Sequence, residues 1–215
     1  MEREKEKEIA NELREKYKPR AIVLHGSRAI GKARPRSDWD VFLLFSGKIP
    51  KNMNREVVAG EDVEWKAVLL PVEDAHIQDT FGIQLQYARV LLEESGEGTE
   101  LIARAKAGYA KGLSVTEDEK RKWRQYLEHK IHGMEDDTDT PYLFLRHLHV
   151  FFDRTVRWWL AIKKNEYSKP WYIAMPIIET EDAAYHTLLM KLCSNTEPKE
   201  KIEAGKKILE KLFDE

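Results

Sequence analysis

The chain has 215 residues, enough for one large domain or two small ones that each bury a core. Charged residues make up 34% of it, yet the formal net charge is only −2, which argues against a general nucleic-acid coat or a polybasic membrane binder. The one cysteine, Cys193, excludes an internal disulfide framework and indicates a reducing compartment.

The ends and apolar stretches of the chain bear on its location. The N-terminus is the charged run MEREKEKE, which does not resemble a signal peptide. The most apolar stretch, 143–162, is interrupted by charged residues at 146, 153, 154 and 157. We therefore expect a cytoplasmic protein with no membrane span and no disulfide-linked partner.

The first half alternates helical and strand-like patterns. Apolar residues at four-residue spacing predict a helix over 3–17, which Pro19 ends. Short apolar runs bounded by Gly, Pro or Asn predict strands over 21–26, 40–45, 63–70 and 87–94. Further helices are predicted over 73–80 and 99–112. This half is therefore expected to form an α/β domain.

After Gly112 the strand signal disappears. Apolar residues recur at i, i+4 and i+8 from Trp123, and residues 141–164 are apolar on more than one side, as in the central helix of a bundle. Two more helices are predicted over 180–194 and 197–213. We expect two domains, residues 1–112 and residues 113–215, the second all-helical.

The segment HGSRAIGKARPRSDWDVFLLF, residues 25–45, carries the most informative pattern. It nearly matches a phosphate-binding P-loop, G-x-x-x-x-G-K-[ST], but Ala33 replaces the hydroxyl residue that would hold magnesium. A P-loop must also run into a helix, and here Pro35 and a strand follow instead. Both the last residue and the context therefore disfavour a P-loop.

A second interpretation rests on paired carboxylates. Asp38 and Asp40 are two residues apart at the start of a strand, so their side chains share one face and suit Mg²⁺. Gly26 allows a phosphate to approach the backbone, and Ser27 offers a hydroxyl and an amide. The loop between them is basic, with Arg28, Lys32, Arg34 and Arg36. This combination suits a metal-bound triphosphate.

The complete arrangement is a strand, Gly26-Ser27, ten intervening residues, and Asp38-Trp39-Asp40 opening the next strand. It resembles the signature of the DNA polymerase β-like nucleotidyltransferase superfamily, in particular its small bacterial and archaeal members. The resemblance implies a small mixed sheet flanked by helices, followed here by the helical bundle. It also implies that Gly26, Ser27, Arg28 and Ser37 contact the nucleotide.

The same resemblance implies a reaction. A nucleoside monophosphate, with AMP the expected group, would pass from ATP or another nucleoside triphosphate to an acceptor hydroxyl, with release of pyrophosphate and two Mg²⁺ ions as cofactors. Asp38 and Asp40 would be catalytic metal ligands. Superfamily members usually add a third carboxylate from a neighbouring strand; Glu64 is the candidate, and Asp62 on the same face is the alternative.

The helical half would bind the acceptor, either an aminoglycoside-like small molecule or a protein or tRNA end. Three features could contribute to that role, although each is also consistent with an ordinary surface or core. They are a polar stripe (Arg146, His149, Asp153, Arg157), an acidic cluster (Glu135, Asp136, Asp137, Asp139) and a group with a cation and aromatic rings (Tyr167, Lys169, Trp171).

A different class of function stays open. Arg124 and His129 loosely resemble the Arg-x4-His nuclease motif of the helical HEPN domains that accompany small nucleotidyltransferases in toxin–antitoxin pairs. On this interpretation the chain is a catalytically weak, nucleotide-binding interaction protein. The intact glycine–serine and aspartate pairs favour an enzyme, because binding alone has no physical need of two adjacent metal carboxylates.

Overall fold

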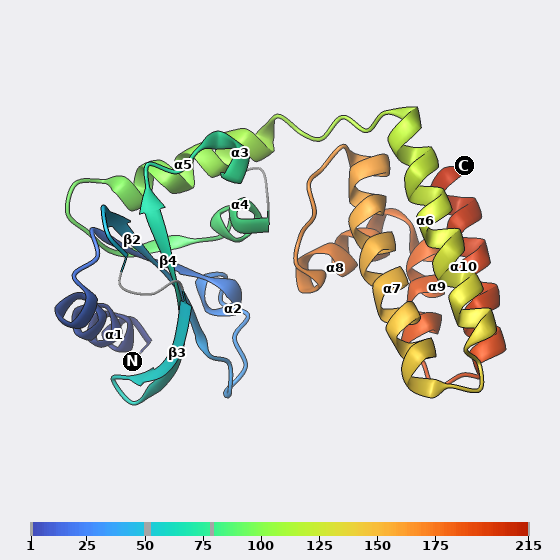
Figure 1. The fold of residues 1–215 in the computed structure, drawn as a ribbon, viewed down its shortest axis with the longest axis horizontal. Coiled ribbons are helices and arrows are strands. Elements are labelled where there is room, and N and C mark those ends of the chain that lie inside the picture. The colour runs from blue at the N-terminus through green and yellow to red at the C-terminus, as the bar shows by residue number, and fades with distance from the viewer. Residues whose placement is uncertain (1, 50–52, 78–79, 215) are drawn as a thin grey trace. The chain divides into compact units, whose positions relative to one another are not determined.

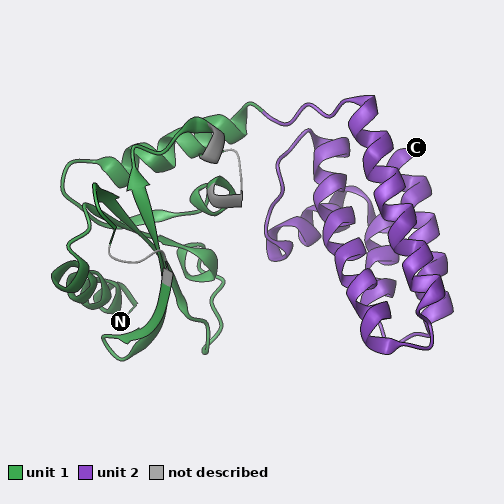
Figure 2. Cartoon of the chain, in the orientation of Figure 1, with its two compact units in different colours: residues 1–111 green, residues 112–215 purple. Residues whose placement is uncertain are grey.

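The computed structural model describes residues 2–49, 53–77 and 80–214 (Figure 1). The chain forms two compact units, residues 1–111 and residues 112–215, which Figure 2 shows in separate colours. The sequence pattern predicts the boundary one residue later. Within the described ranges, no helix is both long and apolar enough to cross a membrane.

Unit 1 combines one sheet with helices. Its elements are, in chain order, α1 Glu2–Tyr17, β1 Ala21–His25, α2 Gly26–Ala29, β2 Trp39–Ser46, β3 Met53–Val58, β4 Glu61–Leu70, α3 Asp74–Ile77, α4 Thr80–Leu85, β5 Arg89–Glu93 and α5 Glu97–Ala110. The strands predicted from the sequence are confirmed as β1, β2, β4 and β5. The helix predicted over 73–80 begins as α3, and residues 78 and 79 lie outside the described ranges.

Strand β3 was not predicted. Its sequence, MNREVV, has a charged pair in the middle and lacks the apolar alternation of a typical strand. It turns into β4 through Ala59 and Gly60, whose φ angles of 51° and 81° form the two-residue hairpin turn that suits twisted strands. Because Ala is unusual at a positive φ, the turn gives little sequence signal.

The sheet is mixed, with the order β3-β4-β2-β1-β5. Strands β2 and β4 are parallel, and all other neighbours are antiparallel. Helix α1 lies on one face and α5 on the other, as Figure 1 shows. The expected small mixed sheet flanked by helices is confirmed, and β2 is its central strand.

Unit 2 is a helical bundle. Its helices are α6 Glu117–Asp136, α7 Pro141–Lys164, α8 Trp171–Glu181, α9 Ala183–Cys193 and α10 Pro198–Phe213. Helix α8 was not predicted, because Pro176 lies inside it and a proline usually marks a helix end. The helix predicted to start at 180 starts at Ala183 instead, because Asp182 caps it by accepting from the Tyr185 amide at 2.9 Å.

Helix α1 is joined to the edge strand β5 by an ion pair. Glu6 is only 7% exposed, and the Arg89 guanidinium donates to both of its carboxylate oxygens, at 2.6 Å from Nη1 to Oε2. The apolar face of α1, with Ile9 and Leu13, is fully buried against the sheet. The charged pair therefore adds a directional contact between α1 and β5 to the apolar packing of α1 on the sheet.

We expect Arg89→Met to lower the free energy of unfolding by about 2 kcal/mol, because Glu6 would keep a buried charge without its partner. The value lies below that of a fully buried pair because the Arg89 side chain is 39% exposed. Denaturant unfolding at neutral pH measures the change. The double variant Glu6→Leu/Arg89→Met should recover most of the loss, and a double variant as unstable as the single one would contradict this account.

Candidate functional site

The two predicted aspartates lie at the start of the central strand. Asp40 is the second residue of β2, and Asp38 precedes the strand by one residue. In the sheet register, Asp40 is opposite His25 of β1 on one side and Glu64 of β4 on the other. The parallel pairing of β2 with β4 therefore brings Glu64 beside Asp40, although the two are far apart in sequence.

The residues on either side of Asp40 hold the strand in the core. Trp39 is 1% exposed and Val41 is fully buried, both in the apolar cluster beneath α1. Because side chains alternate along a strand, Asp40 points to the opposite face. Trp39 and Val41 therefore anchor the strand in the core, and the anchoring fixes which way the Asp40 carboxylate points.

The carboxylates form a cluster whose negative charge the neighbouring cations offset only in part. Burial, together with the negative charges of Asp38 and Glu64, raises the pKa of Asp40 to about 6. Lys66 and Arg55 act in the opposite direction without cancelling the rise. A cation placed among these oxygens would relieve both the repulsion and the desolvation of the charged form.

Gly26 is in close contact with this cluster. Its φ of 71° is a left-handed conformation that glycine adopts easily, and a Cβ on it would overlap the Asp40 carboxylate, lying 3.0 Å from Cγ. The sequence suggested that Gly26 lets a phosphate approach. The structure adds a second reason for the glycine, since the β1–α2 junction must leave room for the Asp40 side chain.

Arg55 is a site residue that the sequence did not reveal. It lies on β3 opposite Glu64. Its Nη2 atom donates to Asp62 Oδ2 at 2.6 Å and lies 3.3 Å from Asp38 Oδ2. Arg55 reaches the carboxylates because β3 pairs with β4. The sequence pattern did not predict β3, so it could not place Arg55 at the site.

The geometry separates the two candidates for the third carboxylate. Glu64 neighbours Asp40 in the register and acts on its pKa, and its own closest cation is Lys66 at 3.6 Å. Asp62 is 52% exposed and bound by two guanidinium nitrogens of Arg55. These contacts favour Glu64.

In the described part of the chain, no three His, Cys, Asp or Glu side chains are grouped closely enough to hold a metal ion by themselves. This does not conflict with a magnesium site. Mg²⁺ in nucleotide enzymes usually takes only one or two carboxylates and completes its shell with water and substrate phosphates. The carboxylates Asp38, Asp40 and Glu64 therefore fit such an ion only together with a substrate.

Arg28 and Ser37, expected to contact the nucleotide, make contacts within the chain. The Arg28 guanidinium donates to the backbone oxygens of Ser37, at 2.6 Å from Nη2, and of Asp38, at 3.1 Å from Nε. It also lies over the Trp39 ring, 4.3 Å from its centroid. Ser37 accepts from the Arg34 amide at 2.9 Å. Both residues therefore shape the loop that presents Asp38.

The rest of the basic loop faces solvent. Lys32, Arg34 and Arg36 are exposed, and none of them pairs with a carboxylate among the described residues. Ser27 is the second residue of the short helix α2, which begins at Gly26. The loop thus offers positive charge next to the negative cluster, the arrangement that a metal-bound polyphosphate requires.

His25 lies next to the cluster but is not a charged member of it. It is 4% exposed and stacks on Phe42 with ring centroids 4.0 Å apart. Burial, together with the positive charge of Lys66, lowers its pKa to about 3. The imidazole is therefore neutral at physiological pH and acts as packing beneath the site.

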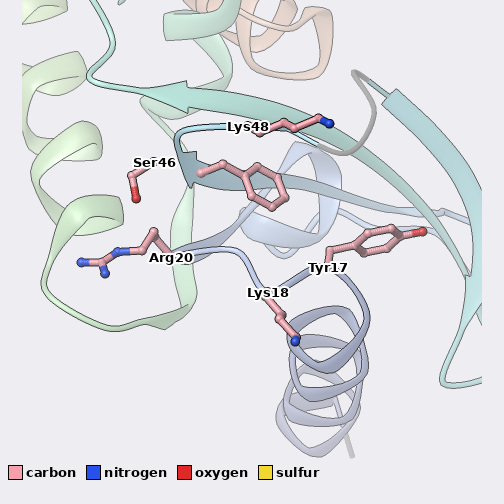
Figure 3. A pocket seen from close by; sticks show the side chains of 6 residues that line it. Tyr17, Lys18, Arg20, Ser46 and Lys48 are labelled. Atoms are coloured by element: carbon pink, nitrogen blue, oxygen red, sulfur yellow. The ribbon is translucent and has the colours of Figure 1, made fainter.

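A hollow in unit 1 lies at the end of β1 and β2 that is farther from the carboxylate cluster (Figure 3). It encloses about 440 Å³ and is lined by Tyr17, Lys18, Arg20, Phe45, Ser46 and Lys48. Its three basic side chains point in different directions, as Figure 3 shows, and the Arg20 guanidinium donates to Glu97. It therefore lacks the converging donors that would hold a phosphate.

Unit 2 distributes its predicted polar features into local contacts. In the polar stripe, Nε of Arg157 donates to Asp153 Oδ1 at 3.0 Å, and Nε1 of Trp171 donates to the same oxygen at 3.2 Å. In the acidic cluster, Asp137 lies 3.3 Å from Nε2 of His147. These contacts fix helices and loops within the bundle.

The arginine and histidine of the loose nuclease resemblance lie on different sides of α6. Five residues along a helix correspond to a rotation of about 140° between side chains. Arg124 is bound by Glu128 and by Asp214, and His129 is exposed. The described contacts therefore give Arg124 a structural role at the end of the bundle.

Known proteins resemble the chain in sequence and in fold. Residues 7–80 match the family model described as "Polymerase beta, Nucleotidyltransferase". A crystal structure of a nucleotidyltransferase-like protein from Exiguobacterium sibiricum 255-15 has a similar fold, with a TM-score of 0.51 and 12% sequence identity, over 97% of this chain and 74% of that one. None of the curated proteins matches the sequence. Residues 7–80 of this chain therefore match a nucleotidyltransferase domain of the polymerase β type.

Proposed function

We propose that unit 1 catalyses magnesium-dependent transfer of a nucleoside monophosphate, with AMP the expected group, from a nucleoside triphosphate to an acceptor hydroxyl, releasing pyrophosphate. The observation that carries the proposal is the half-buried Asp40 carboxylate, placed beside Glu64 by the parallel pair of strands and close to Asp38. The family match over residues 7–80 supports the reaction class.

In this proposal Asp38, Asp40 and Glu64 hold two magnesium ions. Bound magnesium neutralises the charge of the triphosphate and lowers the pKa of an attacking hydroxyl. The donor set suits the ion, because carboxylate oxygens are its preferred protein ligands and the raised pKa of Asp40 reports a cluster that a cation would stabilise.

The chain's own residues bind and orient the triphosphate. Gly26 and Ser27 bring backbone and hydroxyl groups to the phosphates, and the exposed cations of the loop supply positive potential. Arg28 contributes indirectly, by holding the backbone of Ser37 and Asp38 in place. Catalysis would then come from positioning and electrostatics, as in phosphoryl transfer generally.

The acceptor is assigned to the helical half, expected as residues 113–215. A hydroxyl on an aminoglycoside-like small molecule, on a protein or on a tRNA end fits the proposed chemistry equally, because each presents the same reacting group. The mechanism requires only that the hydroxyl reaches the α-phosphorus in line with the leaving pyrophosphate.

We expect the chain to bind a nucleoside triphosphate only when Mg²⁺ is present. Calorimetry with each triphosphate, with and without Mg²⁺, measures this binding. The variant Asp38→Ala/Asp40→Ala should lose this binding, because it removes the proposed metal ligands. Asp62→Ala is the matched control, since it removes an exposed carboxylate of the same surface and should keep magnesium-dependent binding. Equal losses in both variants, or no binding to the native chain, would count against the site.

The unusual pKa of Asp40 predicts a stability effect of fixed sign. Its pKa is about 6 in the folded chain, compared with 3.8 for the ordinary group, so the folded state binds the proton more tightly. The charge of Asp40 therefore costs stability increasingly as pH rises from 4 to 6, and the cost is complete above 6.

Asp40→Asn should consequently abolish transfer while raising the free energy of unfolding by about 1–2 kcal/mol at pH 8, a value reduced for partial exposure, with almost no gain at pH 4. Denaturant unfolding without magnesium at both pH values measures this. Asp62→Asn provides a control of opposite sign, because Arg55 lowers the pKa of Asp62 and its charge is favourable. A destabilised Asp40→Asn at pH 8 would refute the electrostatic account.

Arg55 should compete with the metal for the carboxylates. We expect Arg55→Met to lower the Mg²⁺ concentration needed for half-maximal nucleotide binding by roughly threefold, a small factor because the arginine is exposed and screened. Calorimetric titrations at several fixed magnesium concentrations measure it. An increased magnesium requirement would instead indicate that Arg55 helps to bind the substrate phosphates.

A further inference from the structure

A groove in the helical unit has the properties of a ligand site. It encloses about 350 Å³ between residues of α7, α8, α9 and α10. Its base is apolar and buried, formed by Leu148, Phe152 and Leu192, which are 7%, 8% and 1% exposed. The volume falls at the small end of the range for small-molecule pockets, so it suits one ring system of modest size.

Trp171 forms a fixed wall of this groove. Its indole N–H donates to Asp153 Oδ1 at 3.2 Å, and Nε of Arg157 donates to the same oxygen at 3.0 Å and lies 2.9 Å from Oδ2. The ring meets Phe152 edge to face, with centroids 5.0 Å apart. Although it is held by these contacts, the indole is 38% exposed. An anchored aromatic ring open to a groove is pre-organised to contact another flat ring.

The lining of the groove includes one lysine. Lys201 of α10 lines it, together with His149 and Cys193, and no carboxylate does. Lys201 makes no ion pair with any of the described residues. Its ammonium is close enough to Cys193 to act on that thiol's pKa, although burial has the larger effect and raises it. A lysine in the lining of an otherwise apolar groove, with no carboxylate among the lining residues, favours a ligand with a negative group.

From these contacts we propose that the groove binds a small molecule with a flat aromatic ring and one anionic group. The ring would lie against Trp171 and Phe152, and the anion would meet Lys201. A protein partner fits less well, because a stable protein interface buries about 1,200–2,000 Å² and this groove holds only a single ring system. The inference concerns unit 2 alone and is independent of the proposed transfer reaction.

The first test uses two fluorescent probes. Anilinonaphthalene sulfonate combines flat rings with one negative charge, and phenylnaphthylamine is its uncharged relative. Fluorescence titration of the full chain measures both affinities. We expect Lys201→Met to weaken binding of the sulfonate by about fivefold or more, because a partly exposed charged contact is lost. The affinity for the uncharged probe should stay the same. Trp171→Leu should weaken both probes.

Matched variants separate a built site from general stickiness. Lys199→Met removes an exposed lysine from the same turn of α10 that does not line the groove, and it should bind both probes as the native chain does. Circular dichroism shows whether each variant keeps its helices. Absence of sulfonate binding, or equal weakening by Lys199→Met and Lys201→Met, would overturn the proposal.

Cys193 provides a readout that does not depend on fluorescence. It is the single cysteine of the chain and is exposed at the groove, so alkylation by iodoacetamide reports on this position alone. The sulfonate should slow alkylation of the native chain. The rate without the probe divided by the rate with it should fall towards one in Lys201→Met, even though removing the lysine also changes the thiol itself. Unprotected alkylation in the native chain would contradict occupancy of the groove.

Two natural sources share the proposed chemistry, a nucleotide with its base and phosphate and an aromatic carboxylate. Displacement of the sulfonate by AMP at millimolar concentration would identify the first, and displacement by indole carboxylate the second. Displacement by neither would count against the assigned ligand class. Because the Asp38→Ala/Asp40→Ala variant should keep the groove, probe binding to it distinguishes failure here from failure of the proposed catalytic site.

Discussion

The structure of unit 1 depends on holding one carboxylate, Asp40, half-buried on the central strand among charges of its own sign. The surrounding chain accommodates it in specific ways. Trp39 in the opposite apolar cluster keeps β2 in register, Gly26 leaves space where any side chain would collide, and Arg55 approaches from the neighbouring hairpin. Such an arrangement costs stability, which is the usual consequence of preparing a site to receive a cation and a charged substrate.

How much of this could be read from the sequence depends on the range of the interactions. Strands β1 and β2 were evident because their apolar runs are short and bounded by turn residues. The shared face of Asp38 and Asp40 followed from alternation along one strand. Helix α8 was missed because Pro176 interrupts its pattern, and β3 was missed because its hairpin turns at Ala59-Gly60 without the usual asparagine.

The remaining features of the site depend on strand pairing, which no local pattern encodes. Glu64 could be selected from the sequence only through the family resemblance, whereas the register of β2 with β4 places it beside Asp40. Arg55 reaches the site through the β3–β4 hairpin, which the sequence pattern did not predict. Arg28 shows the converse case. The family motif implies a nucleotide contact, and the structure adds a contact that the motif does not predict, between the Arg28 guanidinium and the loop backbone.

The two units use the same physical device with different chemistry. In each, a partly exposed group is held by contacts that are themselves buried or paired. Asp40 is fixed by the strand that Trp39 anchors, and Trp171 is fixed by Asp153, which Arg157 clamps in turn. Groups that are rigid before a ligand arrives lose little conformational entropy when it binds, so fixed exposure of this kind favours recognition over ordinary packing. A polar or aromatic side chain that is both exposed and fixed is therefore a stronger indication of function than exposure alone.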